Sequence, residues 1–165
     1  IINDYFCRRL GLQTCFTTVA KFEKCPTSCM HMQGNPTNMQ KNPLTTSIRL
    51  KNTSFILLEK IEKLGLSGVK DLIIDPGFGF GKTLEHNYEI LNKLEEFSIF
   101  QLPILVGVSR KSMIYKLLGG GAENALNGTT AVHAIALMKG ANLLRVHDVK
   151  AAVETVRIFN AMQNQ

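Results

Sequence analysis

Tryptophan is absent from the 165 residues, proline occurs only five times, and no long uninterrupted apolar run is present. The scarcity of proline excludes a collagen repeat, and a membrane-spanning helix would need roughly 20 consecutive apolar residues. The longest candidate, residues 129–144, is interrupted by His133 and Lys139. The sequence therefore predicts no membrane partner.

Charge of one sign is also not concentrated anywhere. The 19 Lys and Arg residues exceed the 13 Asp and Glu residues, which gives a net charge of +6, but no basic run forms. A nucleic-acid-binding tail would need such a run, whereas a scattered basic excess suits a small anionic ligand. We expect no nucleic-acid partner.

Cysteine is confined to the first 29 residues, at Cys7, Cys15, Cys25 and Cys29. Paired C-x-x-C spacings are missing, so neither a disulfide framework nor a structural zinc site is expected. The first residues, Ile1–Asp4, show no basic segment followed by an apolar stretch. Without such an export signal, we expect a cytoplasmic protein with free thiols.

What is present is the composition of one folded domain, with 45% hydrophobic and 19% charged residues. Three apolar runs, 71–74, 103–108 and 142–146, each lead through a short polar loop into a helical pattern. Asp75 and Ser109 lie 34 residues apart, which matches a strand plus a crossover helix in a parallel sheet. The C-terminal two thirds therefore predict three βα units.

Two more strand ends are expected nearer the N-terminus, at Ile1–Asp4 and at Met30–Gly34, the second followed by a helix over 55–64 with Gly65 as its C-cap. The fold class is therefore α/β with a parallel sheet of about five βα units. A closed (β/α)8 barrel typically has about 250 residues. The sheet is thus either open or an incomplete barrel.

Polar residues collect after the predicted strands, and ligands of parallel α/β proteins bind at the C-terminal ends of strands. We expect one face to gather Asn3, His31, Gln33, Asp75, Ser109, Lys111, Arg145 and His147.

The glycine-rich segment Asp75–Thr83 ends like a nucleotide phosphate loop, but Pro76 stands where the phosphate-loop motif needs glycine, and Lys82 stands where the dinucleotide-binding pattern does. Glycines alone would allow a tight turn, yet they do not explain Asp75 at a strand end. A carboxylate there can accept two N–H donors, such as the amino-pyrimidinone edge of a pterin.

Two further motifs favour anions. Ser109–Ser112 places two hydroxyls and two cations at a predicted helix start, where capping alone is the alternative. Arg145 and His147 alternate in sequence, so both should project to one side and could meet a diphosphate, while Asp148 caps the last helix. Taken alone, His147 is equally compatible with a structural hydrogen bond.

Read together and in order, the segments 30–36, 75–82, 107–112 and 145–149 resemble dihydropteroate synthase of the folate pathway. The resemblance implies a (β/α)8 barrel that joins 6-hydroxymethyl-7,8-dihydropterin diphosphate to 4-aminobenzoate, releases pyrophosphate and uses Mg²⁺. It also implies a sulfonamide target and a family-like homodimer.

The resemblance assigns roles to individual residues. Asn3 and Asp75 would hold the pterin ring, with Lys111 at its other polar edge. Arg145 would lie over the pterin and meet the diphosphate together with His147. The aminobenzoate would be framed by Phe80, Lys111 and the region of Ser109. Lys111 and Arg145 are the residues expected to act in catalysis.

The chain is expected to be one partial domain over 1–165, well preserved over 55–165 and departing from the family pattern over 1–54. It matches about the fourth to eighth strands, so the family's Mg²⁺-binding Asn and its aminobenzoate loop have no counterpart. Neighbouring reading frames can give family-like text at 5–16 and 26–29, which suggests a local frame shift there and also over 44–54. A non-catalytic remnant is the runner-up interpretation, and an unrelated diphosphate-binding module is the third.

Overall fold

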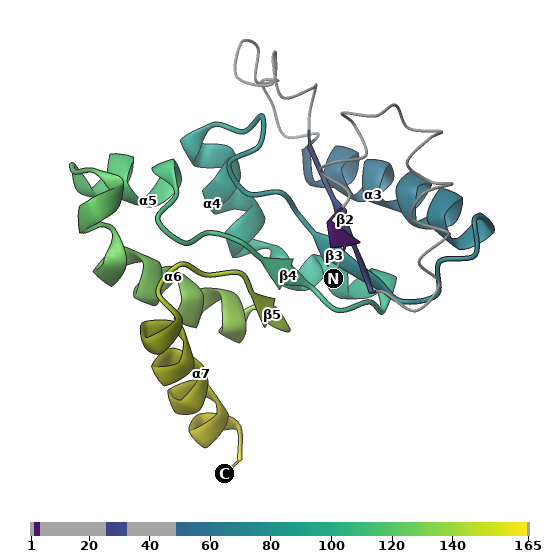
Figure 1. The fold of residues 1–165 in the computed structure, drawn as a ribbon. Helices are drawn as coiled ribbons and strands as arrows, with labels where there is room; N and C mark the ends of the chain where they lie inside the picture. Colours follow the sequence, from purple (N-terminus) through teal and green to yellow (C-terminus); the bar gives the residue numbers. More distant parts are fainter. Residues whose placement is uncertain (1, 4–25, 33–48, 165) are drawn as a thin grey trace.

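The structure, a computed structural model, describes residues 2–3, 26–32 and 49–164, with 2–3 and 49–52 described by their backbone (Figure 1). Short strands alternate with helices along these residues, as predicted for an α/β protein. The elements are β1 Ile2–Asn3, β2 Thr27–Met30, α3 Arg49–Leu66, β3 Leu72–Asp75, α4 Leu84–Asn92, the 3₁₀ helix η2 Leu94–Phe100, β4 Leu105–Val106, α5 Ser112–Leu118, the 3₁₀ helix η3 Ala122–Asn124, α6 Leu126–Met138, β5 Leu143–Leu144 and α7 Val149–Gln163.

The strands lie side by side in chain order and all pairs are parallel. β1 pairs with β2 and β2 with β3, while β4 pairs with β5. A parallel bridge between Ile74 and Ile104 joins the two groups, and Ile74 donates its N–H to the Pro103 carbonyl at 2.8 Å. This succession of neighbouring parallel strands with crossover helices confirms the predicted parallel α/β fold, and it is the arrangement found in part of a (β/α)8 barrel.

Alternation along the strands separates a helix-facing side from a ligand-facing side. Cys29, Leu72 and Ile74 belong to the buried apolar core that also includes Leu57 and Leu64 of α3. Residues adjacent to them in sequence face the opposite way, because successive side chains in a strand point to opposite faces. Among these is Asp75, at the C-terminal end of β3.

Helix α3 extends beyond its predicted range. α3 includes Gly65, so Gly65 is not the C-cap. The chain instead turns at Gly68, whose φ is 89°, and Val69 then donates its N–H to the Leu64 carbonyl at 3.1 Å. A left-handed residue favours glycine, which explains why the turn falls at the second glycine of this segment.

Strand β2 forms although its sequence is polar. Thr27, Ser28 and Cys29 are each fully buried, and β2 pairs with β3 from Thr27 to Met30. The small polar residues Thr27 and Ser28 are therefore compatible with the backbone of a buried parallel strand. One polar group in the strand is left unsatisfied, because the Ser28 Oγ is buried with no hydrogen-bond partner among the described residues.

Several predictions fall on residues outside the described ranges. These are the frame-shift hypothesis over 5–16 and 44–48, the strand end at Gln33 and Gly34, and the thiols of Cys7, Cys15 and Cys25. Cys29 is described and is a free, buried thiol.

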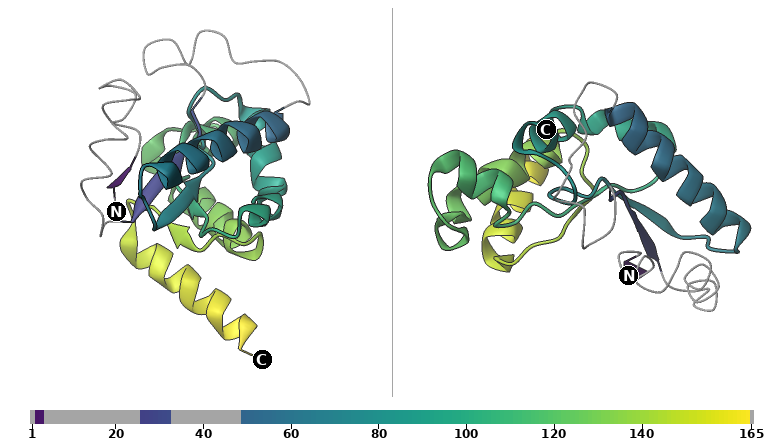
Figure 2. Two further views of the ribbon diagram at one scale, coloured as in Figure 1. Left: turned by 90° about the vertical axis from the view of Figure 1, so that its right-hand side faces the viewer. Right: turned by 90° about the horizontal axis from the view of Figure 1, so that it is seen from above.

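The C-terminal half follows the predicted βα pattern, with one helix that the periodicity did not reveal. α6 packs between α5 and α7, and it carries apolar residues with little separation of faces. α7 packs on α6 and then projects from the remainder of the described chain, with the C-terminus at its far end (Figure 2). Asp148 stands at the N-cap position of α7 but makes no side-chain capping bond, so its predicted capping role is wrong.

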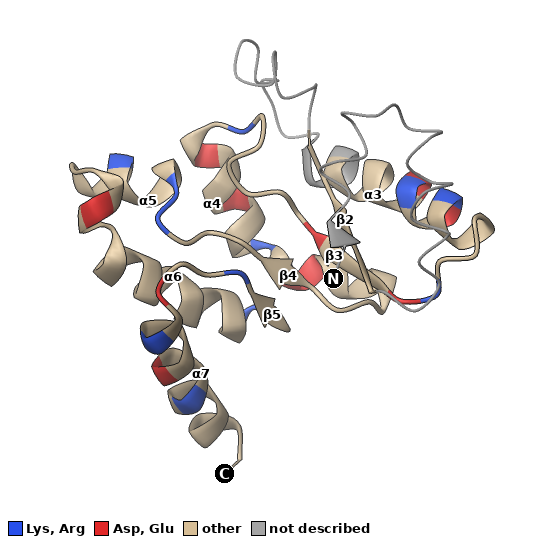
Figure 3. Cartoon of the chain, in the orientation of Figure 1, with Lys and Arg blue, Asp and Glu red and all other residues tan. Residues whose placement is uncertain are grey.

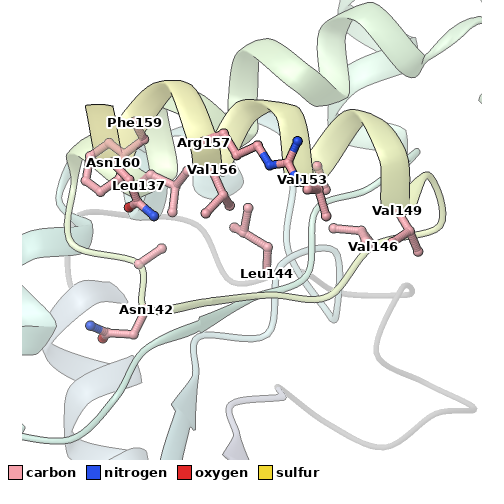
Figure 4. Close-up of a pocket in the computed structure, with 12 residues that line it drawn as sticks. Leu137, Asn142, Leu144, Val146, Val149, Val153, Val156, Arg157, Phe159 and Asn160 are labelled. Carbon is pink, nitrogen blue, oxygen red and sulfur yellow. The ribbon is translucent and has the colours of Figure 1, made fainter. Parts of the chain in front are cut away.

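A cavity of about 660 Å³ lies between the edge strand β5 and α7. Leu144, Val146, Val153, Val156 and Phe159 line it, and Figure 4 shows the side chains of α7 directed toward the backbone of β5. Its lining also includes the polar residues Asn142, Arg157 and Asn160.

Charges of both signs alternate along α3 and α7 (Figure 3), in line with the scattered charge of the sequence. In the described part of the chain, none of the helices combines the length and apolarity that a membrane crossing requires.

Candidate functional site

The C-terminal ends of β3, β4 and β5 bring the predicted polar residues to one face. A pocket of about 260 Å³ is lined by Gly107, Ser109, Lys111, Arg145 and His147, together with Val146. The β4–β5 register, Leu105 with Leu143 and Val106 with Leu144, sets residues 107–111 beside 145–147. Four residues predicted from sequence to meet the ligand therefore lie together.

Asp75 is the buried acid of this face, with 1% of its surface exposed. Its Oδ1 accepts a 2.8 Å hydrogen bond from the N–H of Gly77, while its Oδ2 has no partner among the described residues. Burial raises the pKa of Asp75, and the Gly77 hydrogen bond and the charges of Arg145, Lys111 and Lys82 oppose that rise. One acceptor oxygen of this buried carboxylate is thus left without a donor among the described residues.

Lys111 approaches the loop after β3 from the start of α5. Its Nζ donates to the carbonyl of Phe78 and lies 4.6 Å from the ring centroid of Phe80. Burial lowers the pKa of Lys111 to about 8, although the charge of Asp75 acts in the opposite direction. The two residues predicted to frame the aminobenzoate, Phe80 and Lys111, are therefore neighbours.

Arg145 packs against the backbone of β4 at a glycine. A Cβ at Gly107 would lie 2.8 Å from the Nη2 of Arg145, so a side chain there would displace the guanidinium. The Arg145 N–H donates to the Val106 carbonyl at 2.9 Å. The side chain is exposed on the pocket side, where it can reach an anion.

His147 is oriented by Ser109, and this is a structural role that the sequence did not reveal. The buried Ser109 Oγ accepts from the backbone N–H of His147 at 3.2 Å and lies 3.0 Å from its Nδ1. This leaves the Nε2 of His147 for a ligand. The hydroxyl of Ser109 is thus engaged with His147, and it fixes the orientation of the imidazole at the pocket.

The two cations of the Ser109–Ser112 motif separate. Arg110 adopts a φ of 51° and turns away, and its guanidinium binds both carboxylate oxygens of Asp148 at 2.8 Å. This pair explains why Asp148 does not cap α7, because its oxygens are already occupied. Of the two cations, Lys111 alone contacts the glycine-rich loop.

Asn3 lies at the end of β1, beside Ser28 of β2 and two residues before the level of Met30 and Asp75. Its backbone is thus on the sheet that carries Asp75, two strands away. The described part of the chain places this residue by its backbone.

Lys82 is a residue that the sequence reasoning considered and set aside. Its Nζ donates to the carbonyls of Gly77 at 2.7 Å and Phe80 at 3.2 Å and lies 2.9 Å from the Nδ1 of His31. The spacing of nucleotide-binding loops excludes a phosphate-binding lysine here, but it does not reveal a lysine that binds its own loop. A signal was available, because a tight glycine-rich loop leaves carbonyl groups that need donors.

Comparison with known proteins places these features in a family. The sequence pattern of the pterin binding enzymes matches residues 1–147. Dihydropteroate synthase of Escherichia coli K12 is 46% identical over 138 residues, which cover 82% of this chain and 49% of the relative. The chain thus spans about half the length of this curated relative.

Solved structures agree. The Yersinia pestis dihydropteroate synthase in a sulfonamide drug complex has a TM-score of 0.87 and 41% identity, over 91% of this chain and 55% of that one. The Thermus thermophilus enzyme in complex with 4-aminobenzoate has a TM-score of 0.85 and 33% identity, over 92% of this chain and 62% of that one. The resemblance to dihydropteroate synthase predicted from the four motifs is confirmed, and the chain belongs to the family of pterin binding enzymes.

Proposed function

We propose that this chain provides the pterin and diphosphate subsites of a dihydropteroate synthase of folate biosynthesis. In that transferase reaction, 6-hydroxymethyl-7,8-dihydropterin diphosphate and 4-aminobenzoate give 7,8-dihydropteroate and pyrophosphate. The observation that carries the proposal is the buried Asp75, whose Oδ2 has no donor among the described residues although the charges of Arg145 and Lys111 act on the carboxylate. A pterin supplies adjacent N–H donors that match a carboxylate.

The pterin ring would lie against Asp75, with Asn3 and Lys111 at its other polar positions. Arg145 would cover the ring and bind the diphosphate. His147 would donate a hydrogen bond from its Nε2–H to the diphosphate. Support comes from the cationic lining of the pocket and from the Thermus thermophilus relative, which is also known in complex with 6HMPPP. Phe80 and Lys111, with Ser109 behind them, would frame the aminobenzoate.

The chemistry asked of these residues is positioning and charge stabilisation. The bond between the pterin methylene carbon and the diphosphate oxygen breaks, and its electron pair leaves with pyrophosphate. The arylamine nitrogen then attacks the methylene carbon and loses a proton. Lys111 and Arg145 would stabilise the charge that develops on the leaving group, an effect worth about 3 kcal/mol for a well-placed donor.

Mg²⁺, implied by the resemblance, does not fit the pocket formed by the described residues. Its lining carries Lys111 and Arg145 as charged groups, and in the described ranges no cluster of three or more His, Cys, Asp or Glu side chains could hold a metal. Mg²⁺ prefers carboxylate and water oxygens. A requirement for Mg²⁺ stays a proposal, with ligands drawn from outside these residues.

Homodimer formation and a cytoplasmic location are part of the same proposal. The runner-up is a remnant that binds pterin or diphosphate without catalysis. The two functions make different predictions for an assembly in which the rest of the barrel is supplied.

The test is therefore complementation. The 165-residue chain is co-expressed with the part of the Escherichia coli relative that it does not cover, and pyrophosphate release is measured with both substrates and Mg²⁺. Activity should require both parts, should disappear in Lys111→Met, and should persist in Lys150→Met, which makes the same change at an exposed lysine of α7. A stable assembly that binds pterin without turnover would establish the remnant, and one that binds no pterin would overturn both.

A further inference from the structure

The glycine-rich loop after β3 is held from inside by its own last lysine. Lys82 is partly buried, and its Nζ donates to the carbonyls of Gly77 and Phe80. Asn87 of α4 holds the same loop by accepting from the Gly79 N–H at 2.7 Å. Among the described residues, the ammonium of Lys82 therefore joins the first and last parts of the loop.

Gly77 links Lys82 to Asp75. The N–H of Gly77 donates to the Asp75 Oδ1, and its carbonyl accepts from the Lys82 Nζ at 2.7 Å. Gly77 has a φ of 69°, and a Cβ at this position would overlap the carbonyl oxygen of His31. A residue fixed at both polar ends and packed this closely transmits a displacement of Lys82 to the Asp75 carboxylate.

Lys82 and Asp75 also interact through charge. Burial lowers the pKa of Lys82 to about 7, and the negative charge of Asp75 opposes this lowering while Lys111 adds to it. Among the described residues, the ionisable groups that face Lys82 are Asp75 from β3, Lys111 from the start of α5, and His31 after β2, 2.9 Å from its Nζ. Arg145 acts on this cluster through Asp75 and Lys111.

We propose that Lys82 is a positioning residue for pterin binding, which fixes the Asp75 carboxylate through Gly77 and favours its ionised form by its positive charge. The proposal rests on the function proposed above for Asp75. Lys111 faces the ligand from the pocket, whereas Lys82 acts from within the loop. Under this proposal two lysines serve one carboxylate, and of the two Lys111 would contact the substrate.

The charge coupling can be measured on the 165-residue chain without any ligand. Aspartate occurs at positions 4, 71, 75 and 148, so ¹³C-carboxyl labelling gives four signals, and Asp75→Asn identifies the one from Asp75. Lys82→Met should raise the pKa of Asp75 further, Lys82→Arg should largely restore it, and Lys70→Met, at an exposed lysine, should leave it unchanged. Reciprocally, Asp75→Asn should lower the pKa of Lys82 by the same amount, because coupling between two sites is reciprocal.

Equal, reciprocal changes would not arise if Lys82 merely filled space. An unaltered Asp75 titration in a folded Lys82→Met chain, checked by circular dichroism, would overturn the proposal. If Lys82→Met does not fold, the Lys82 titration in Asp75→Asn decides alone. In the complemented assembly, Lys82→Met should weaken pterin binding about tenfold and Lys82→Arg much less. Failure of the unmutated assembly to bind pterin would instead count against the proposed function.

Discussion

Asp75 is nearly inaccessible to solvent, yet one of its two oxygens has no donor among the described residues. Burial of an ionised carboxylate is costly unless charges or hydrogen bonds compensate. Here the compensation comes from the Gly77 N–H and from three cations at longer range. A ligand that supplies N–H donors would complete it.

We therefore expect Asp75→Asn to abolish measurable pterin binding in the complemented assembly. Losing one partner of a buried charge-assisted pair costs roughly 2 to 5 kcal/mol. The raised pKa of Asp75 adds a pH dependence, since affinity should fall as the pH drops through that value and the carboxylate takes up a proton. Calorimetry at two pH values tests both statements, and unchanged affinity in Asp75→Asn would remove Asp75 from the site.

His133 on α6 provides a second prediction for a single residue. It is 2% exposed, its Nε2 has no partner in the described part of the chain, and burial lowers its pKa. Below the ordinary histidine pKa of about 6.5, His133 is protonated in the unfolded chain but stays neutral in the folded chain. Stability should thus decrease as the pH falls below that value, by at most about 1.4 kcal/mol per pH unit, until the lowered folded pKa is reached.

Urea midpoints of the chain and of His133→Leu, measured from neutral pH downward, separate this contribution from those of other groups. The variant should match or exceed the chain near neutral pH, because leucine leaves no unpaired nitrogen, and its advantage should grow on acidification. Parallel pH curves for the two proteins would show that His133 does not titrate in this way.

At the scale of elements, periodicity and spacing predicted the parallel βα units, and alternation predicted that Arg145 and His147 share a side. Both follow from backbone geometry that repeats along the chain. The sequence could not indicate that Ser109 binds His147 or that Arg110 captures Asp148, since these pairs depend on the register of β4 beside β5. Helix α6 could not be predicted from periodicity, because its apolar residues are not confined to one face.

The β4–β5 pair predicts an anion site that survives in the isolated chain, since Lys111, Arg145 and His147 all follow these strands. Pyrophosphate should perturb the NMR signals of Arg145 and His147, and Gly107→Ala should weaken its binding severalfold, about 1 kcal/mol, because the new methyl group meets the Arg145 guanidinium. The urea midpoint should change little, since the displaced group is the flexible end of an exposed side chain. Equal pyrophosphate affinity in Gly107→Ala would place the anion elsewhere.

At the scale of the whole molecule, the described chain leaves apolar surface uncovered along its last helix. Val149, Val153, Ile158 and Met162 of α7 are all exposed, and the cavity beside β5 opens next to them. In a parallel barrel, helices and strands bury such surfaces between them. The segment shared with the Escherichia coli relative is about half of that relative's length.

We expect the 165-residue chain alone to show no synthase activity and to self-associate as its concentration rises. Unpaired strand edges and exposed apolar residues favour association, and half of a barrel cannot orient both substrates. Light scattering and the pyrophosphate assay, with and without the complementary part, test this. A monomer that turns over at the rate of the Escherichia coli enzyme would contradict it.

The pairing of each strand with its successor has a consequence for how the chain opens. Ile74 lies in the central strand β3, fully buried, with its N–H bonded to Pro103, whereas β5 is an edge strand whose residues are partly exposed. Amide hydrogen exchange should therefore be slowest at Ile74 and faster at Leu144, because local openings start where contacts are fewest. Since each βα unit contacts mainly the adjacent unit, opening of an edge unit leaves the next one intact. The described chain would then lose structure one unit at a time, from its margins toward β3.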